Sequence, residues 1–310
     1  DYFNSKLILF NKLVKKGGTV IYDNDIYHSK ILKKICKNKN LKSLTIGKKN
    51  SNLIIKKHEY FGNQQIVEIE FNKKKYSFST NLIGKIQVKN ILFSILAASR
   101  SKIKFNKIIE SIKNIKPVEG RLEIIGNIKN NSKVILDYAH TPDALKYTLE
   151  SIKEQFGQST ISIVFGCGGD RDKDKRSIMG KIANQYCNKI FLTDDNPRYE
   201  NPNKIRNQIK KKITRSKLVE IPSRKKAIKI AIKNLNSGDI LLVAGKGHEI
   251  YQEYRGKKKI FSDKKSILKE INFKNLKLFK NWKANILNEK CNLSLVNKKL
   301  KINKASINSK

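Results

Sequence analysis

The sequence has few cysteines and no long apolar run. The four cysteines, Cys36, Cys167, Cys187 and Cys291, stand far apart among 310 residues and form no CxxC pair. Structural zinc sites and disulfide frameworks need closely spaced cysteines, so the pattern argues against both and favours a reducing, cytoplasmic compartment. No apolar run approaches the roughly 20 residues that span a bilayer, and the first residues carry no basic-then-apolar leader. We therefore expect neither membrane insertion nor a secretory signal.

Acidic residues are also few, with 26 Asp and Glu against 67 Lys and Arg, for a formal net charge of +41. Such an excess of positive charge raises the possibility of a nucleic-acid partner. However, lysine is spread through nearly every segment together with Asn and Ile, and no recognisable nucleic-acid-binding motif accompanies it. Compositional drift explains the charge more simply, so we expect no specific nucleic-acid partner. The alternative of a basic nucleic-acid-binding protein predicts lysines gathered on one face and binding that weakens steeply with salt.

The length of the chain and its punctuation predict two domains and a tail. Residues 1–116 mix strand and helix patterns: residues 18–22 form a short apolar run, residues 66–71 alternate, and residues 90–99 form an apolar helix. Near the start, Leu7, Phe10 and Leu13 fall on one helical face. Pro117 ends this pattern and marks a boundary, so residues 117–272 form the second domain. Residues 273–310 are rich in Lys and Asn, which predicts a disordered tail or the start of a fused domain.

Strand-like and helix-like segments alternate in the second domain, which predicts an α/β fold. Its strand candidates are so apolar that both faces must be buried, as in a parallel sheet covered by helices. These runs are residues 134–136, 161–165, 189–192 and 239–243, and the intervening helices are predicted at 142–154, 176–187, 203–213 and 223–236. Polar and glycine residues follow each run, at 137–140, 166–171, 193–198 and 244–249. Because ligands bind outside the carboxyl ends of parallel strands, we expect these four loops to line an active site.

The same four loops carry a family resemblance. The strings DYAHTPDAL (137–145), FGCGGDRDKDKR (165–176), TDDNPR (193–198) and AGKGHE (244–249) resemble the C-terminal domain of the Mur ligases. Within that family they are most similar to the enzymes that add diaminopimelate, and the resemblance runs from Tyr2 to about residue 271. It implies that residues 1–116 are the C-terminal half of the central ATP-binding Mur ligase domain. Residues 117–272 would be the Rossmann-like C-terminal domain, with a mainly parallel sheet.

The resemblance also implies an activity. Mur ligases are ATP-dependent acid–amino-acid ligases: they activate a carboxylate as an acyl phosphate, which an amino-acid amine then attacks. For this chain the implied reaction joins meso-diaminopimelate to UDP-MurNAc-L-Ala-D-Glu in cytoplasmic peptidoglycan precursor synthesis. ATP and Mg²⁺ are the implied cofactors, and a monomer is expected. A related Mur or folylpolyglutamate-type ligase with another acceptor, and a non-catalytic remnant, stay open as alternatives.

The loop Asp195-Asn196-Pro197-Arg198 has a physical reason to select the amino acid. The planar guanidinium of Arg198 can bind a carboxylate through two parallel hydrogen bonds, and Asn196 offers both a donor and an acceptor. Lysine lacks the second carboxylate of diaminopimelate, so admitting it would leave Arg198 unpaired. Glu249 suits a substrate ammonium. The residues assigned to diaminopimelate by resemblance are Arg171, Asp195, Asn196, Arg198, Gly245 and Glu249; the histidines His140 and His248 are given no catalytic role.

A second set of residues is assigned to the nucleotide by the same resemblance. Asn90, Arg121 and Asp137 would contact ATP, and Asp137 would bind ribose or orient Arg121. Lys6 matches the family's carbamylated lysine, whose added carboxylate oxygens would ligate Mg²⁺. Gln87 stands where the family usually has Asn, which puts that contact in doubt.

One motif is missing from residues 1–310: there is no GxxxxGK[ST] phosphate loop. In the family this loop and a UDP-sugar-binding domain precede the segment that contains Lys6. We therefore expect the chain to be part of a longer protein, and to bind ATP poorly and turn over little by itself.

Overall fold

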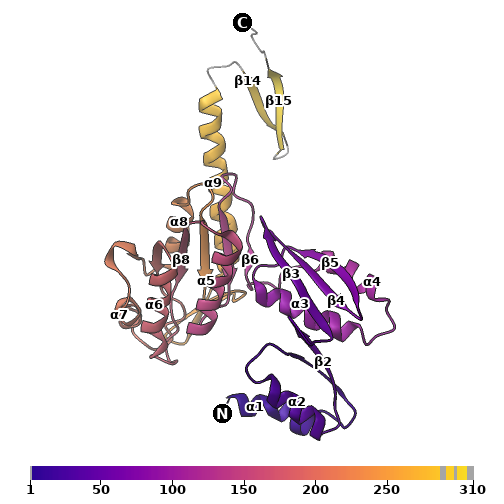
Figure 1. Ribbon diagram of the computed structural model, residues 1–310. Coiled ribbons are helices and arrows are strands. Elements are labelled where there is room, and N and C mark those ends of the chain that lie inside the picture. Colours follow the sequence, from indigo (N-terminus) through magenta and orange to yellow (C-terminus); the bar gives the residue numbers. More distant parts are fainter. Residues whose placement is uncertain (1, 287–290, 297–298, 306–310) are drawn as a thin grey trace. The chain divides into compact units, whose positions relative to one another are not determined.

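The computed structural model describes residues 2–286, 291–296 and 299–305. The chain forms two compact units (Figure 1). The N-terminal unit contains Asp1–Val118 together with Glu150–Gln158, and the C-terminal unit contains Glu119–Leu149 and Ser159–Lys310. The division at residue 118 lies close to the boundary predicted at Pro117.

The N-terminal unit is built on a five-stranded sheet in the order β1-β2-β3-β4-β5. The first three strands are mutually parallel, and β4 and β5 continue the sheet in antiparallel fashion. The strands are β1 (Thr19–Asp23), β2 (Lys42–Gly47), β3 (Leu53–Phe61), β4 (Gln64–Phe71) and β5 (Lys74–Thr80). The helices are α1 (Tyr2–Ile8), the π-helical turn η1 (Leu9–Leu13), α2 (Ser29–Asn38), α3 (Lys85–Ala98), α4 (Phe105–Ser111) and the 3₁₀ turn η2 (Ile112–Asn114).

The core of this unit follows the predicted patterns. Alternate residues of β4, Val67 and Ile69, are fully buried, and Leu92 and Leu96 from α3 belong to the same cluster. The predicted strand near residue 20 and helix near residue 90 are therefore confirmed as β1 and α3.

The expected helical face near the start of the chain is only partly correct. Leu7 and Phe10 pack against the cluster under α2, but Leu13 is 67% exposed and Val14 takes its place. The Val14 N–H donates to the Leu9 carbonyl at 3.0 Å, five residues back, as in a π-helix. This wider turn shifts the inward-facing position by one residue.

The C-terminal unit contains a six-stranded sheet in the order β10-β9-β8-β11-β7-β6. Every neighbouring pair is parallel except β6 with β7, which confirms the predicted Rossmann-like, mainly parallel sheet. The strands are β6 (Glu123–Ile124), β7 (Lys133–Asp137), β8 (Ile161–Phe165), β9 (Lys189–Leu192), β10 (Leu218–Glu220) and β11 (Ile240–Ala244). The four predicted strands are β7, β8, β9 and β11; the edge strands β6 and β10, of two and three residues, carry too short a pattern to detect.

Helices and a hairpin complete this unit. They are α5 (Pro142–Phe156), whose last residues group with the N-terminal unit, α6 (Lys175–Tyr186), α7 (Pro202–Lys210), η3 (Arg215–Lys217), α8 (Arg224–Lys233), α9 (Asp263–Ile286) and the hairpin β12 (Tyr251–Tyr254) with β13 (Lys257–Ile260). Within the described ranges, no helix is both long and apolar enough to cross a membrane.

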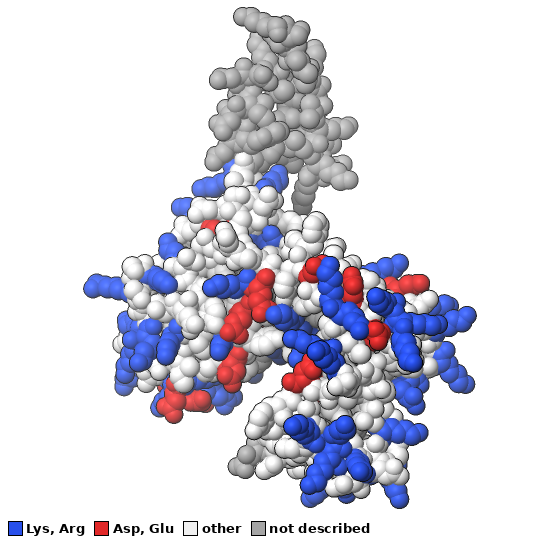
Figure 2. Space-filling view, viewed as in Figure 1, with Lys and Arg blue, Asp and Glu red and all other residues white. Residues whose placement is uncertain are grey.

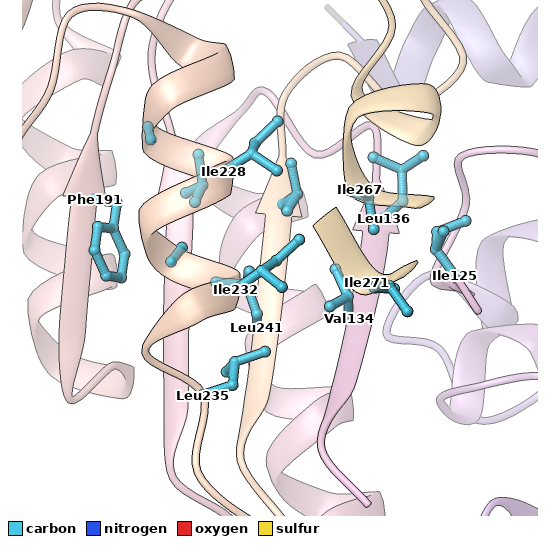
Figure 3. Packing of buried hydrophobic residues seen from close by; sticks show 14 of the residues in the cluster. Ile125, Val134, Leu136, Phe191, Ile228, Ile232, Leu235, Leu241, Ile267 and Ile271 are labelled. Carbon is cyan, nitrogen blue, oxygen red and sulfur yellow. The ribbon is translucent and has the colours of Figure 1, made fainter. Parts of the chain in front are cut away.

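Two helices pack their apolar faces against the sheet of the C-terminal unit (Figure 3). Ile228 and Ile232 come from α8, and Ile267 and Ile271 from α9; they share one cluster with buried residues of β7 and β11. All five residues of β11 are buried. This packing holds the carboxyl ends of the central strands in place, which is where the predicted site lies.

The boundary predicted at residue 272 falls inside α9. Leu278 also packs against the core, about four helical turns after Asp263 begins the helix, so apolar contacts carry the helix past that point. Further along, β14 (Cys291–Val296) pairs with β15 (Lys299–Ala305) as an antiparallel hairpin. The other residues of the predicted tail, 287–290, 297–298 and 306–310, lie outside the described residues.

Candidate active site

Four loops leave the same edge of the sheet in the C-terminal unit. They follow β7, β8, β9 and β11, which run parallel, so the predicted rim is present in the fold. The contacts between these loops decide which predicted site residues meet.

Asn196 lies in the middle of the rim and is 3% exposed. Its Oδ1 accepts hydrogen bonds from Lys246 Nζ at 2.9 Å and from the Glu253 N–H at 3.1 Å. Its Nδ2 donates to Glu249 Oε2 at 3.0 Å, across 53 positions of sequence. The structure thus brings together Asn196 and Glu249, two residues predicted for the same ligand, and fixes the orientation of the Asn196 amide.

Arg198 is held by its backbone as well as its side chain. Its φ of +52° is unusual for a residue other than glycine, and its N–H and carbonyl bond to Glu253 and Arg255 on the hairpin. Nη1 donates to the Gly169 carbonyl at 2.8 Å, and Nε lies 3.6 Å from Glu253 Oε2. A Cβ at Gly168 would stand 2.9 Å from Nη1, so a side chain there would displace the end of Arg198 from this position. The guanidinium therefore lies at the rim. Among the described residues its Nη2 makes neither of these contacts, so Nη2 can donate to a ligand.

Asp195 points beneath the loop. It is 8% exposed, and burial raises the pKa of its carboxyl while Arg224 and Lys246 act in the opposite direction. Its Oδ2 lies 3.8 Å from Arg224 Nη1. A Cβ at Gly245, whose φ is +110°, would come within 2.8 Å of the same Oδ2. Asp195 therefore packs against Gly245 and the buried arginine.

Arg224 ties the loops to the two core helices. Its side chain is fully buried, and Nε and Nη2 donate to the two Asp263 carboxylate oxygens at 2.8 and 2.6 Å. Nη2 also donates to the Ala244 carbonyl at the end of β11. A paired buried arginine thus joins the first residues of α8 and α9 to the strand that carries Gly245 and Glu249.

The glycine-rich loop after β8 has its own anchor. Arg176 is fully buried and donates two hydrogen bonds to Glu200, each at 2.9 Å, and one to the Gly168 carbonyl. This pairing lowers the pKa of Glu200 to about 2. Arg171 is exposed on the same loop, where the anchored backbone presents it at the rim.

Arg121 and Asp137, two of the predicted ATP ligands, lie beside the same edge. Asp137 accepts hydrogen bonds from the Leu122 N–H and the Ala139 N–H, both at 2.8 Å, and from Thr148 Oγ1 at 3.2 Å. Burial raises the pKa of this carboxyl. The exposed Arg121 guanidinium lies 4.6 Å from the centre of the Tyr138 ring. Asp137 thus fixes the backbone next to Arg121, which supports the orienting role over a direct ribose contact.

The fit to a nucleotide can be judged on these residues. Gly120 approaches the loop after β11 so closely that a Cβ added to Gly120 would stand 2.5 Å from the backbone nitrogen of His248. Arg121 follows it as an exposed cation with one face on an aromatic ring, an arrangement that suits a phosphate or an adenine ring. The donor set therefore fits part of a nucleotide site.

The remaining predicted residues, Lys6 and Asn90, belong to the N-terminal unit. Lys6 is exposed on α1, and Asn90 on α3 donates to Gln87 Oε1 at 3.4 Å. In the described part of the chain, no three His, Cys, Asp or Glu side chains gather as metal ligands. The expectation of Mg²⁺ therefore rests on Lys6 and on the phosphates of the nucleotide.

Sequence reasoning missed four residues that support the rim: the buried Lys246, Arg224 and Asp263, and the half-buried Glu253. Lys246 stands inside a recognised motif, yet nothing in the sequence separates it from dozens of solvated lysines. The other three lie outside the motifs altogether.

The four polar loops at one edge of the parallel sheet carry the motifs of a Mur ligase. Comparison with known protein families gives the same assignment. Residues 1–98 match the Mur ligase middle domain, and residues 120–247 match the Mur ligase glutamate ligase domain. The chain belongs to the Mur ligase family, as its motifs predicted.

Individual relatives show which members of the family this chain is similar to. The chain is 42% identical over 273 residues to a protein of Rickettsia felis named UDP-N-acetylmuramoyl-L-alanyl-D-glutamate--2,6-diaminopimelate ligase; the match covers 86% of this chain and 51% of that protein. A protein of the same name from Chelativorans sp. is 38% identical, with 87% of this chain and 55% of that protein covered. This chain thus spans about half the length of the curated relatives it matches.

Solved structures of Mur ligases also resemble this chain. A structure of a UDP-N-acetylmuramoyl-L-alanyl-D-glutamate--2,6-diaminopimelate ligase aligns with a TM-score of 0.64 at 29% identity, covering 88% of this chain and 56% of the other. A MurF ligase from Thermotoga maritima in complex with ADP aligns with a TM-score of 0.62 at 15% identity, covering 89% of this chain and 58% of the other, which shows a shared fold.

Proposed function

We propose that the protein containing this chain is an ATP-dependent amide ligase of peptidoglycan precursor synthesis. It joins meso-diaminopimelate to the D-glutamate carboxylate of UDP-MurNAc-L-Ala-D-Glu. The observation that carries this proposal is the hydrogen bond from Asn196 to Glu249, because it joins two residues assigned to the same amino acid across 53 positions of sequence, on the rim that also holds the Arg198 guanidinium. The relatives named for this reaction support the same assignment.

The charges at the rim suit the amino-acid head at the far end of diaminopimelate. A carboxylate would pair with Arg198, with Arg171 and with the second Nδ2 hydrogen of Asn196, while an ammonium would pair with Glu249. L-Lysine offers only the ammonium at that end. Its binding would leave Glu253, 3.6 Å from Nε, as the carboxylate beside Arg198, so lysine would lack the charged hydrogen bonds of a second carboxylate, worth about 1.5–3 kcal/mol.

ATP and Mg²⁺ complete the proposal. Arg121 and Asn90 would hold the nucleotide, Asp137 would keep Arg121 in position, and a carbamate on Lys6 would offer oxygen ligands to Mg²⁺. When bound, ATP supplies the phosphoryl group that activates the substrate carboxylate. The chain's own residues then keep the amine of the second substrate in line. We place the protein in the cytoplasm as a monomer.

Phosphate release by the full-length gene product tests the proposal. The enzyme would receive ATP, Mg²⁺ and UDP-MurNAc-L-Ala-D-Glu with either meso-diaminopimelate or L-lysine. We expect turnover with diaminopimelate and little with lysine; equal use of the two would reject the acceptor assignment.

Arg198→Ala sharpens this test. Loss of charged hydrogen bonds worth about 1.5–3 kcal/mol should raise the KM for diaminopimelate about 10- to 100-fold. The KM for ATP should stay within a factor of about two, since Arg198 is assigned to the acceptor alone. Arg215→Ala, at an exposed arginine of η3, is the matched control. A change in ATP binding instead of diaminopimelate binding would show that Arg198 is wrongly assigned.

The high positive charge favours no second function. On the face shown in Figure 2, lysine and arginine side chains lie over both units with acidic side chains among them. A spread of this kind is typical of compositional drift, whereas a nucleic-acid-binding surface gathers its cations.

A further inference from the structure

Lys246 is a fully buried lysine at the centre of the rim. A lysine is almost never buried without a partner, because its ammonium loses its hydration. Here Nζ donates to Asn196 Oδ1 at 2.9 Å and to Glu249 Oε2 at 2.7 Å. Both partners belong to the set expected to hold the acceptor amino acid, yet Lys246 itself was assigned no role.

The local backbone explains how Lys246 reaches both residues. It lies two residues after the end of β11, between Gly245 and Gly247, whose φ values of +110° and +52° turn the chain on either side of it. The Glu249 N–H closes this turn on the Lys246 carbonyl at 3.0 Å. Lys246 and Glu249 therefore leave the same turn three residues apart, with Asn196 bound between them from the loop after β9.

These contacts decide which atoms remain for a ligand. Asn196 Oδ1 already accepts from Lys246 and from the Glu253 N–H, so it is saturated. Asn196 Nδ2 gives one of its two hydrogens to Glu249 Oε2, and Glu249 receives both of its recorded hydrogen bonds on that oxygen. Among the described residues, one hydrogen of the Asn196 amide and Glu249 Oε1 are left; they are a donor for a carboxylate and an acceptor for an ammonium.

We propose that Lys246 is a positioning residue for the acceptor amino acid: it holds the Asn196 amide with nitrogen toward the ligand and holds Glu249 by one oxygen only. This inference rests on the proposed acceptor site. Rotation of the Asn196 amide by half a turn loses three hydrogen bonds when Lys246 is present, two at Oδ1 and one from Nδ2 to Glu249, but only two without Lys246. The rotated amide would present a carbonyl oxygen to the substrate carboxylate, which repels it.

The test uses Lys246→Met in the full-length gene product. We expect the KM for diaminopimelate to rise about 10- to 100-fold, as for the loss of a charged hydrogen bond, with the KM for ATP unchanged. Lys274→Met is the matched control, because Lys274 on α9 also donates two hydrogen bonds, to the Lys233 and Leu235 carbonyls at the end of α8, but is assigned to no ligand. The control should leave both KM values unchanged.

A double-mutant cycle separates positioning from a structural role. On an Asn196→Ala background there is no amide to orient, so Lys246→Met should raise the KM for diaminopimelate much less than in the parent protein. Equal effects on the two backgrounds, or equal rises in both KM values, would overturn the proposal.

Two other results also bear on the proposal: a variant that does not fold, and a parent enzyme that accepts another amino acid. If Lys246→Met does not fold, Lys246→Gln is measured instead: because Gln keeps a donor for Asn196, the KM for diaminopimelate should rise less than about 10-fold, and a rise as large as that of Asn196→Ala would overturn the proposal. Failure of both variants to fold while Lys274→Met folds would make Lys246 a stability residue and would also overturn it. If the parent enzyme accepts another amino acid in place of diaminopimelate, the proposed function fails, and the same cycle is measured with that amino acid.

Discussion

Removing the Asp263 carboxylate should destabilise the C-terminal unit more than almost any other single change. Asp263 is fully buried and accepts two hydrogen bonds from Arg224, which is itself fully buried. In Asp263→Ala the Arg224 cation stays in the interior, with Asp195 at 3.8 Å as its nearest remaining carboxylate. The substitution therefore leaves a largely uncompensated buried charge.

The expected loss is about 3–5 kcal/mol of unfolding free energy, as found when one partner of a buried ion pair is removed. Hydrogen exchange at the amides of β11 measures it locally, because this strand is central in the sheet and opens only when the C-terminal unit unfolds. A local readout is needed since two units need not unfold together.

Two variants bracket the result. Lys210→Ala removes one partner of a pair with Glu220 whose side chains are 37% and 29% exposed, and it should cost at most about 1 kcal/mol. Replacing both Arg224 and Asp263 by apolar residues of similar volume should recover part of the loss, because neither charge of the pair remains and Asp195, which loses Arg224, still has Lys246 nearby. If Asp263→Ala cost no more than Lys210→Ala, the account of a charge stranded beneath the rim would be refuted.

Three further predictions follow from the site. Gly245→Ala should weaken diaminopimelate binding at least 10-fold in phosphate-release assays, because φ at this position is +110° and a Cβ would press on a buried carboxylate; unchanged kinetics would contradict it. Glu200 has a lowered pKa of about 2, so its ion pair stabilises the fold above the ordinary pKa of a glutamate and is lost as pH falls through about 2. Acid unfolding of Glu200→Gln should accordingly vary less with pH between about 4.5 and 2 than that of the parent protein, and identical profiles would argue against the pair. In the full-length protein with isotopically labelled bicarbonate, a carbamate NMR signal should appear and should vanish in Lys6→Arg; its absence from an active, Mg²⁺-bound enzyme would exclude the modification.

The sequence by itself determined four strands of the C-terminal sheet, its mainly parallel character and the family. Buried parallel strands are short, wholly apolar runs, so β7, β8, β9 and β11 are readable from local composition, and the polar loops that follow them are fixed in order along the chain. The motif in which Asn196 and Arg198 stand is likewise a local string. Its recognition needed no knowledge of what surrounds it.

Local sequence patterns did not predict which residues face the core where a helical turn holds one extra residue, or where contacts distant in sequence extend a helix. Leu13 was expected on the inner face of the first helix, but a π-helical turn brings Val14 there instead. The end of the ordered region was predicted at residue 272, whereas Leu278 still packs on the core and α9 continues. Neither effect leaves a signature in composition.

Only the tertiary structure decided which charged residues are buried and with whom. Lys246 differs in no sequence property from the solvated lysines around it, yet the fold places its ammonium between Asn196 and Glu249, 50 and three positions away. Arg224 and Asp263 meet across 39 positions because α8 and α9 pack side by side. Burial and long-range pairing are properties of the packed chain, so the loops that meet substrate were readable in the sequence, while the buried charges that hold them in position were not.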